Sequence, residues 1–259
     1  MVARVWSDGH GSYYRAVDIS RLKTEYIKLQ RNMMNPPGLF ITGTDTGVGK
    51  TYLTALIARQ LASQGYRVGV YKPAGSGCDE ESDTDAQFLW RAAGCPLRLE
   101  DVCPQEFSAP LAPHLAARAE QREVDVALLR TGLEPWKSSA DIVLVEGVGG
   151  LMSPLSEDDY VADLIFEFGY PLIVVAPDRI GTINQTLQTL ITAATFRGGL
   201  SLAGVVLNQV DQSEDISRET NWRELEHRCV PPVIARLRHG SLEADTPVDW
   251  SALAGHENR

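Results

Sequence analysis

The chain has 259 residues, of which 44% are hydrophobic, and its 34 acidic and 24 basic residues give a net charge of -10. This length suits one α/β domain, alone or with an appendage, and the hydrophobic fraction can supply a sizeable core. The negative charge argues against nucleic acid as the main partner, and no apolar run approaches the roughly 20 residues that span a membrane. The four cysteines lack CxxC spacing, which favours free thiols in a reducing compartment. We therefore expect a soluble, cytoplasmic protein.

Residues 1–37 differ in character from the rest of the chain. They mix basic residues with three acids, hold few serines and end in NMMNPPG, so they do not match a transit peptide, which is poor in acids. The diproline Pro36-Pro37 stops a helix and favours an extended chain, so it marks a boundary. We predict an appendage that is poorly ordered in part, or an overlong start with Met33 or Met34 as the first residue. Residues 38–259 are then one domain.

From Gly38 onward, short apolar runs alternate with helix-like segments, and Gly65 fits the position just past the end of the first helix. Such alternation implies parallel strand pairing, so we predict a doubly wound α/β fold with ligands at the carboxyl ends of the strands. Two segments with blurred limits, 109–121 and 124–133, also look helical. Strands are expected at 39–42, 67–71, 141–145, 171–177, 202–210 and 233–237, and helices at 50–64, 83–93, 160–169, 182–196 and 218–229.

The stretch GTDTGVGKT follows the first expected strand. Its end matches the phosphate-loop pattern GxxxxGK[ST], although Thr44 stands where the first glycine belongs. Gly47 and Gly49 let backbone N–H groups turn toward a phosphate, and the helix that starts at Lys50 adds its positive end. Lys50 can reach the β- and γ-phosphates, while the Thr51 hydroxyl can bind Mg²⁺. The stretch therefore predicts a P-loop NTPase fold and a bound nucleoside triphosphate.

Lys72 and Ser76 follow the second strand in the stretch YKPAGSG. Pro73 favours an extended conformation at Lys72, so its ammonium projects from the end of the strand. The glycines around Ser76 let the backbone come close to a ligand. A solvated lysine before a turn is the structural alternative, and the neighbouring phosphate loop favours a functional site.

Two acids are candidates for the metal. In the acidic run DEESDTDAQF, a solvated loop explains most of the acids, and Asp85 is best placed, at the start of a helix, to help bind Mg²⁺. Glu146 ends the apolar strand of DIVLVEGVGG, at the position where an acid helps bind the metal in phosphate-loop enzymes. The glycines after Glu146 permit close approach of a ligand, and a structural glycine turn is the alternative.

Two asparagines follow later strands. Gly181 and Thr182 leave N–H groups unpaired at a helix start, which suits a carboxylate. Asn184 considered by itself is better interpreted as a first-turn residue without a ligand. Asn208 in VVLNQVD can pair with the N6/N7 edge of adenine. The run from Asn208 to Asp211 also resembles the guanine reader NKxD without its lysine. Residue chemistry alone therefore leaves ATP and GTP both open.

The chain from about residue 38 to 237 resembles dethiobiotin synthetases. The stretches GTDTGVGKT, YKPAGSG, SDTDA, APLAPHLAA and VEGVGGLMSPL occur in the order and spacing of that family. The resemblance implies a cytoplasmic ligase that uses ATP and Mg²⁺ to close a ring from 7,8-diaminononanoate and CO₂ or bicarbonate. One amine captures CO₂ as a carbamate, which accepts the γ-phosphoryl group, and the second amine then expels phosphate to give dethiobiotin and ADP.

The resemblance also implies roles for particular residues. Lys72 and Lys50 are catalytic, and the family's homodimer places the diamine at the interface, with Gly181 and Asn184 binding its carboxylate from the partner subunit. Ser76 contacts the substrate in the same scheme. The metal residues are Thr51, Asp85 and Glu146. The ATP contacts are Gly47, Val48, Gly49, Lys50, Thr51, Tyr52, Asp85, Glu146, Gly147, Val148, Gly149, Asn208 and Gln209.

The chain departs from the family's pattern in two places. Gly47 stands where many members carry an acid, and residues 235–238 stand where the adenine loop often reads GxxP. Two other functions remain as alternatives: a sensor or switch module of the same superfamily without ring closure, and a partition-type or maturation NTPase. Asp45 occupies the place of the second lysine of partition-type ATPases, which counts against the latter.

Overall fold

The computed structural model describes residues 35–78 and 83–256. Most of the predicted appendage, with Met33 and Met34, therefore lies outside the described residues, as do residues 79–82 of the acidic run. The domain boundary at residue 37 stays a prediction. None of the helices in the described part of the chain is long and apolar enough to cross a membrane.

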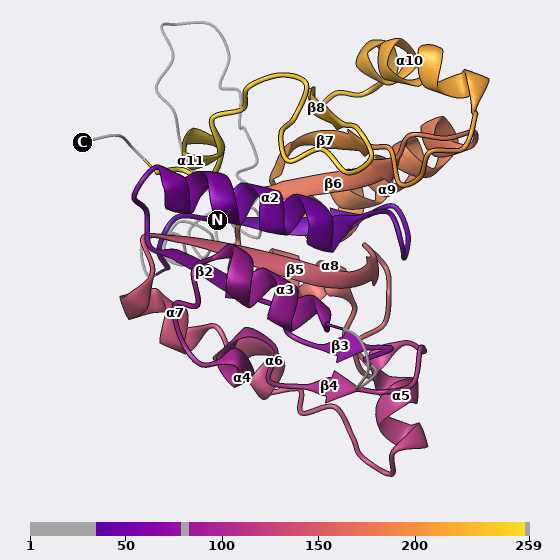
Figure 1. Cartoon of the computed structure of the whole chain (residues 1–259). Helices are drawn as coiled ribbons and strands as arrows, with labels where there is room; N and C mark the ends of the chain where they lie inside the picture. The colour runs from indigo at the N-terminus through magenta and orange to yellow at the C-terminus, as the bar shows by residue number, and fades with distance from the viewer. Residues whose placement is uncertain (1–34, 79–82, 257–259) are drawn as a thin grey trace, which may run out of the picture.

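A six-stranded sheet in the order β2-β5-β1-β6-β7-β8 organises the molecule (Figure 1). All of its strand pairs are parallel, which confirms the predicted doubly wound α/β fold. Every residue of β1 and β6 is buried, because helices cover both faces, and such strands therefore read as continuous apolar runs. The strands are β1 (Gly38–Gly43), β2 (Val68–Tyr71), β5 (Ile142–Gly150), β6 (Leu172–Pro177), β7 (Leu202–Asn208) and β8 (Val233–Leu237).

Helices lie on both sides of this sheet: α2 crosses in front of it in Figure 1, and α8 lies behind β5. Gly65 follows α2 with a φ of 92°, in the left-handed region expected after a helix end. The longer helices are α2 (Lys50–Ser63), α3 (Asp85–Ala92), α8 (Val161–Phe168), α9 (Thr182–Thr195) and α10 (Asn221–Arg228). The short ones are α4 (Leu99–Val102), α6 (Leu128–Thr131), α7 (Glu134–Ser139), α11 (Trp250–Leu253) and the 3₁₀ turns η1 (Phe196–Gly198) and η2 (Ile216–Glu219).

The middle of the chain is less helical than predicted. In the segment 109–121 the helix is α5 (Pro113–Ala119), which begins at a proline because a proline at the first position sacrifices no hydrogen bond. In the segment 124–133 only α6 is helical. Asp125 marks where the helical turns begin, since its Oδ1 accepts from the Leu128 N–H at 2.9 Å. The Gln105 amide accepts from the Asp125 N–H at 2.7 Å and donates to the Asp125 carbonyl at 3.1 Å. The Asp125 carbonyl also accepts from the Leu129 N–H at 3.2 Å, so the helical hydrogen bonds start at this residue.

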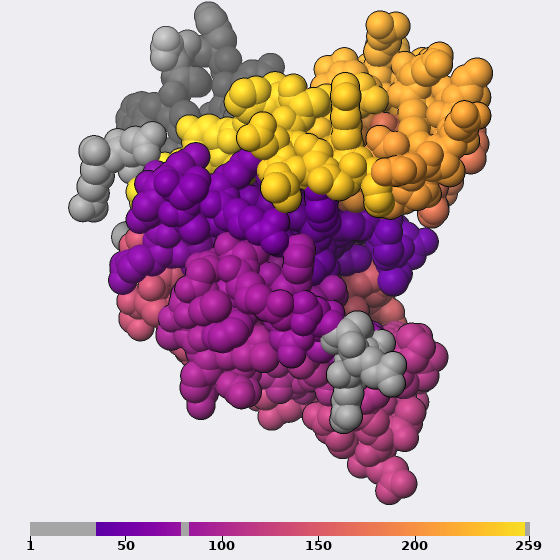
Figure 2. Space-filling model, viewed as in Figure 1, coloured from indigo at the N-terminus to yellow at the C-terminus, as the bar shows by residue number. Residues whose placement is uncertain are grey.

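Two very short strands, β3 (Gly75–Ser76) and β4 (Glu106–Phe107), pair in parallel as a separate sheet that the sequence does not predict. They tie the chain that follows β2 to the middle segment, close to α5 in Figure 1. The space-filling view shows that this part and the carboxyl-terminal part of the chain lie at opposite ends of the molecule (Figure 2). Because Ser76 pairs with Phe107 in the small sheet, this sheet fixes the position of Ser76.

Trp136 of α7 is fully buried and packs against β2. A side chain at Gly69 would lie 2.9 Å from its ring, so the glycine makes room for the indole. The indole N–H donates to the Asp101 carbonyl at 3.3 Å, which satisfies its polar atom inside the core. This contact anchors the irregular middle segment on the sheet.

We expect Trp136→Ala to lower the free energy of unfolding by about 3–5 kcal/mol, because it removes a large buried ring and leaves a cavity. Urea denaturation followed by circular dichroism measures this. Ile191→Ala, at a side chain that is 65% exposed, serves as the control and should change the value by less than about 0.5 kcal/mol. Equal effects of the two substitutions would contradict the anchoring role of Trp136.

Candidate active site

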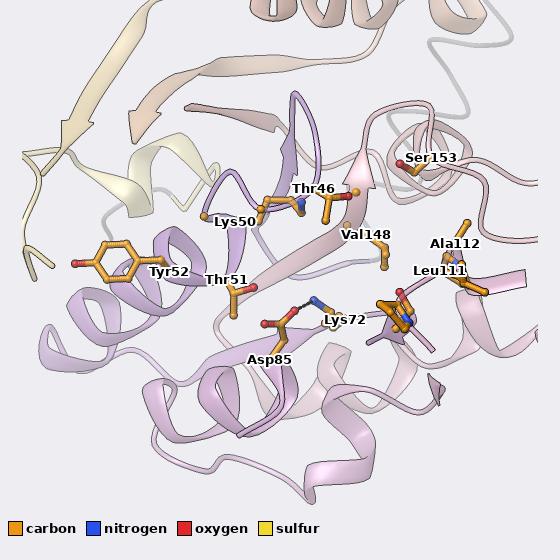
Figure 3. A pocket seen from close by; sticks show the side chains of 17 residues that line it. Thr46, Lys50, Thr51, Tyr52, Lys72, Asp85, Leu111, Ala112, Val148 and Ser153 are labelled. Atoms are coloured by element: carbon orange, nitrogen blue, oxygen red, sulfur yellow. Dashed lines mark hydrogen bonds and ion pairs between the residues drawn. The ribbon is translucent and has the colours of Figure 1, made fainter. Parts of the chain in front are cut away.

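A cavity of about 780 Å³ opens at the carboxyl ends of β1, β2 and β5 (Figure 3). Ligands of doubly wound sheets bind at this edge. Most of the predicted ATP, substrate and metal residues line the cavity, although they come from distant parts of the sequence. The lining consists of Thr46, Gly47, Gly49, Lys50, Thr51, Tyr52, Lys72, Ser76, Asp85, Pro110, Leu111, Ala112, Pro113, Gly147, Val148, Gly149 and Ser153.

The loop between β1 and α2 has the backbone that phosphate binding requires. Gly47 and Gly49 take φ values of 71° and 91°, a region that side chains rarely adopt. Helix α2 begins at Lys50, so the unpaired N–H groups of its first turn lie at the cavity. The Lys50 ammonium donates to the Asp45 carbonyl at 3.1 Å. The loop is thus shaped to receive an anion.

Lys50 is buried, with 7% of its surface exposed. Burial lowers its pKa to about 8, and the positive charge of Lys72 acts in the same direction against the attraction of Glu146. A buried cation without a close carboxylate partner is unfavourable, because burial removes its hydration. A phosphate group beside it would supply the missing negative charge.

Lys72 lies between two carboxylates. Its ammonium donates to Glu146 Oε1 at 2.8 Å and forms an ion pair with Asp85, marked by the dashed line in Figure 3. Burial alone would lower the pKa of Lys72, but Glu146 and Asp85 outweigh it and hold the pKa well above its ordinary range. Lys72 therefore keeps its positive charge at the floor of the cavity.

The predicted metal residues are brought together here. The Thr51 hydroxyl donates to Glu146 Oε1 at 2.8 Å, and Asp85 meets Glu146 through their shared partner Lys72. Glu146 Oε2 is buried without a hydrogen-bond partner, so one carboxylate oxygen is free to act as a metal ligand. A group of three His, Cys, Asp or Glu ligands does not occur within residues 35–78 and 83–256. Two carboxylates and a hydroxyl fit Mg²⁺, which completes its six oxygens with phosphate and water.

The far wall of the cavity comes mainly from one segment that carried no predicted role. Pro110, Leu111, Ala112 and Pro113 precede and begin α5, and Leu111 is 47% exposed. Thr46 and Ser153 complete the set of unassigned lining residues. Residues 110–113 lie in the motif APLAPHLAA, Ser153 in VEGVGGLMSPL and Thr46 in GTDTGVGKT, so the family resemblance covers them although no local chemical pattern singles them out.

Four predicted ATP contacts, Val48, Glu146, Asn208 and Gln209, do not line the cavity. Val48 is 1% exposed and Asn208 is 4% exposed. The Gln209 N–H donates to the Leu237 carbonyl at 2.9 Å, which joins the ends of β7 and β8. Tyr52 does line the cavity, and its hydroxyl donates to the Ser241 carbonyl after β8.

Gly181 and Asn184 lie at the start of α9, outside the cavity lining, and both are exposed. One detail of the prediction is wrong: the Thr182 N–H is not unpaired, because it donates to the Arg179 carbonyl at 3.2 Å in the turn before the helix. Gly181 itself has a φ of 92°. The structure therefore does not bring these residues to the site formed by the same chain.

Comparisons with known proteins identify relatives over most of the chain. A family model described as an AAA domain matches residues 37–242. The ATP-dependent dethiobiotin synthetase BioD of Rhodopirellula baltica is 41% identical over 217 residues, covering 78% of this chain and 84% of that protein. The protein of the same description from Bacillus subtilis is 36% identical over 198 residues, with 76% and 85% coverage.

Among solved structures, the signal recognition particle receptor FtsY of Elizabethkingia anophelis matches with a TM-score of 0.53, at 15% identity, over 95% of this chain and 75% of that one. At this identity the likeness concerns the fold alone, which is that of a P-loop NTPase. The sequence similarity to the two synthetases is far stronger and extends over most of both chains. The chain therefore belongs to the family of ATP-dependent dethiobiotin synthetases.

Proposed function

We propose that this protein is a cytoplasmic dethiobiotin synthetase, which uses ATP and Mg²⁺ to close the ureido ring of dethiobiotin from 7,8-diaminononanoate and CO₂. The observation that carries this proposal is the buried ammonium of Lys72, which lies beside the phosphate loop on the lining of the same cavity. A phosphoryl transfer to a carbamate concentrates negative charge, and fixed positive charge is what stabilises it.

The reaction begins when one amine of the diamine captures CO₂ as a carbamate. Lys50 and the loop N–H groups orient the triphosphate, and Lys72 holds the carbamate oxygen in line with the γ-phosphoryl group. Transfer of that group leaves ADP and a carbamic–phosphoric anhydride. The second amine attacks the carbonyl carbon, the bond to the phosphate oxygen breaks, and the ring closes with release of phosphate.

Mg²⁺ would be held by Thr51, Asp85 and Glu146, and when bound it neutralises charge on the phosphate oxygens. The carboxylates that pair with Lys72 are thus the same ones that face the metal. Ser76 and Val148 line the cavity where the diamine would lie. The proposed route forms no covalent intermediate with the protein, so it needs no nucleophilic side chain activated by a base.

The diamine's carboxylate would be bound by a second copy of the chain. Gly181 and Asn184 stand exposed at a helix start outside their own cavity, which suits a role in the partner's site. Ile180 and Ile216, next to this helix start, are 80% and 85% exposed, and exposed apolar side chains of this kind are typical of an interface. We therefore include a homodimer, with residues 38–259 as its catalytic domain, in the proposal.

We expect Lys72→Ala to lower the rate of dethiobiotin formation by about 100-fold or more, since it removes one fixed charge from the transferring group. Purified protein is incubated with diaminononanoate, bicarbonate, Mg²⁺ and ATP, and dethiobiotin is detected by mass. Lys137→Ala, at an exposed ion pair with Glu134, is the matched control and should retain the wild-type rate. Nucleotide binding without any product in the wild type would favour the sensor or switch alternative.

Metal removal tests the carboxylate site. EDTA should abolish product formation and added Mg²⁺ should restore it. Glu146→Gln should raise the Mg²⁺ concentration for half-maximal rate by roughly 10-fold or more, because it weakens one ligand of the metal. Glu157→Gln, at an exposed ion pair with Arg118, is the control. An unchanged Mg²⁺ requirement in Glu146→Gln would remove this residue from the metal site.

A mixing experiment tests whether the site is shared between subunits. Asn184→Asp places a negative charge where the substrate carboxylate would bind, and Lys72→Ala disables the other half of the site. When equal amounts of the two variants exchange subunits at random, about half of the dimers are mixed, and each mixed dimer has one intact site out of two. Mixing should therefore recover about a quarter of the wild-type activity. Activity that stays at the level of the separate variants would contradict a shared site.

A further inference from the structure

The side chain of Asn208 connects the end of β7 to the phosphate loop. Its Nδ2 donates to the Val48 carbonyl at 2.9 Å, across 160 residues of sequence. Both residues are buried, with 4% and 1% of their surfaces exposed. A buried backbone carbonyl needs a partner, and its loss leaves an unsatisfied polar group. This hydrogen bond is therefore part of the loop's own structure.

Gly49 shows how closely the two segments pack. A Cβ atom at this position would lie 2.0 Å from Asn208 Nδ2, so only glycine leaves room for the amide. The peptide bond between Val48 and Gly49 is trans, and its C=O and N–H point in opposite directions. Because Asn208 holds the carbonyl on its side, the Gly49 N–H faces away from Asn208. Gly49 lines the cavity and Asn208 does not, so that N–H is aimed at the phosphate side.

We propose that Asn208 is a positioning residue for triphosphate binding: by fixing the Val48–Gly49 peptide, it aims a loop N–H at the phosphates. The inference rests on the proposed function only in taking ATP as the ligand of this loop. This role differs from the expected contact with the base, because a residue that contacts only the base changes the affinity only for ligands that carry a base. Asn208 acts on any ligand that carries the phosphate chain.

The test uses Asn208→Asp, which keeps the size and the acceptor oxygen but replaces the donor with a carboxylate that repels the Val48 carbonyl. We expect the dissociation constant of Mg²⁺–tripolyphosphate, which has no base, to rise by about 10-fold, as that of Mg²⁺–ATP does. Titration calorimetry measures both. Gln212→Ala, at an exposed residue four positions further on, is the matched control and should leave the tripolyphosphate affinity unchanged.

Amide hydrogen exchange of residues 47–51 in the protein without nucleotide gives a second measurement. The exchange should be faster in Asn208→Asp than in the wild type, and it decides the matter if tripolyphosphate binds too weakly to measure. If the aspartate variant unfolds, Asn208→Ala is measured in the same way. Weaker ATP binding with unchanged tripolyphosphate affinity and unchanged exchange would overturn the inference, as would no effect at all.

These results are independent of whether the proposed reaction takes place. A wild-type protein that binds tripolyphosphate but forms no dethiobiotin would refute the proposed function and leave the positioning role of Asn208 in place. If the wild-type protein forms dethiobiotin, and Asn208→Asp changes neither the tripolyphosphate affinity nor the amide exchange of residues 47–51, only the positioning role is refuted.

Discussion

The buried ion pair between Lys72 and Glu146 is the interaction on which the rest of the site depends. Glu146 is fully buried, and a buried charge without a partner costs several kcal/mol. The two charges are therefore stable only together, and they join the residue that follows β2 to the middle of β5. Asp85 adds the start of α3 to the same cluster, and the Thr51 hydroxyl adds the start of α2. Charge compensation thus sets the relative positions of four segments that are far apart in the sequence.

The sheet topology explains why these segments can meet at all. In the order β2-β5-β1, the strand that carries Glu146 lies between the strands that lead to Lys72 and to the phosphate loop. Parallel pairing brings all three carboxyl ends to one edge. Strand pairing in the main sheet does not position the opposite wall of the cavity, because that wall comes from the irregular middle segment. The small sheet of β3 and β4, and Trp136 against Gly69, hold that segment in place.

The sequence predicts the regular parts of this fold because their signals are local. The predicted strand at 233–237 coincides with β8, and the predicted helix at 182–196 differs from α9 by one residue. The middle segment is predicted poorly, since its short helices depend on contacts between residues far apart in the sequence, such as those between Gln105 and Asp125. Motif spacing places Lys50, Lys72, Asp85 and Glu146 at one edge of the sheet. No local pattern indicates the bond from Asn208 to Val48, because it joins residues 160 positions apart.

The high pKa of Lys72 has a consequence for how protons move in the proposed reaction. An ammonium held between Glu146 and Asp85 stays protonated throughout the physiological range, so it can stabilise charge but cannot accept a proton. The protons that the two amines lose as the carbamate and the ring form must then pass to groups other than this lysine, such as the substrate's own oxygens, phosphate or water. The pH dependence of ring closure would accordingly reflect the basicity of the diamine more than the titration of this lysine.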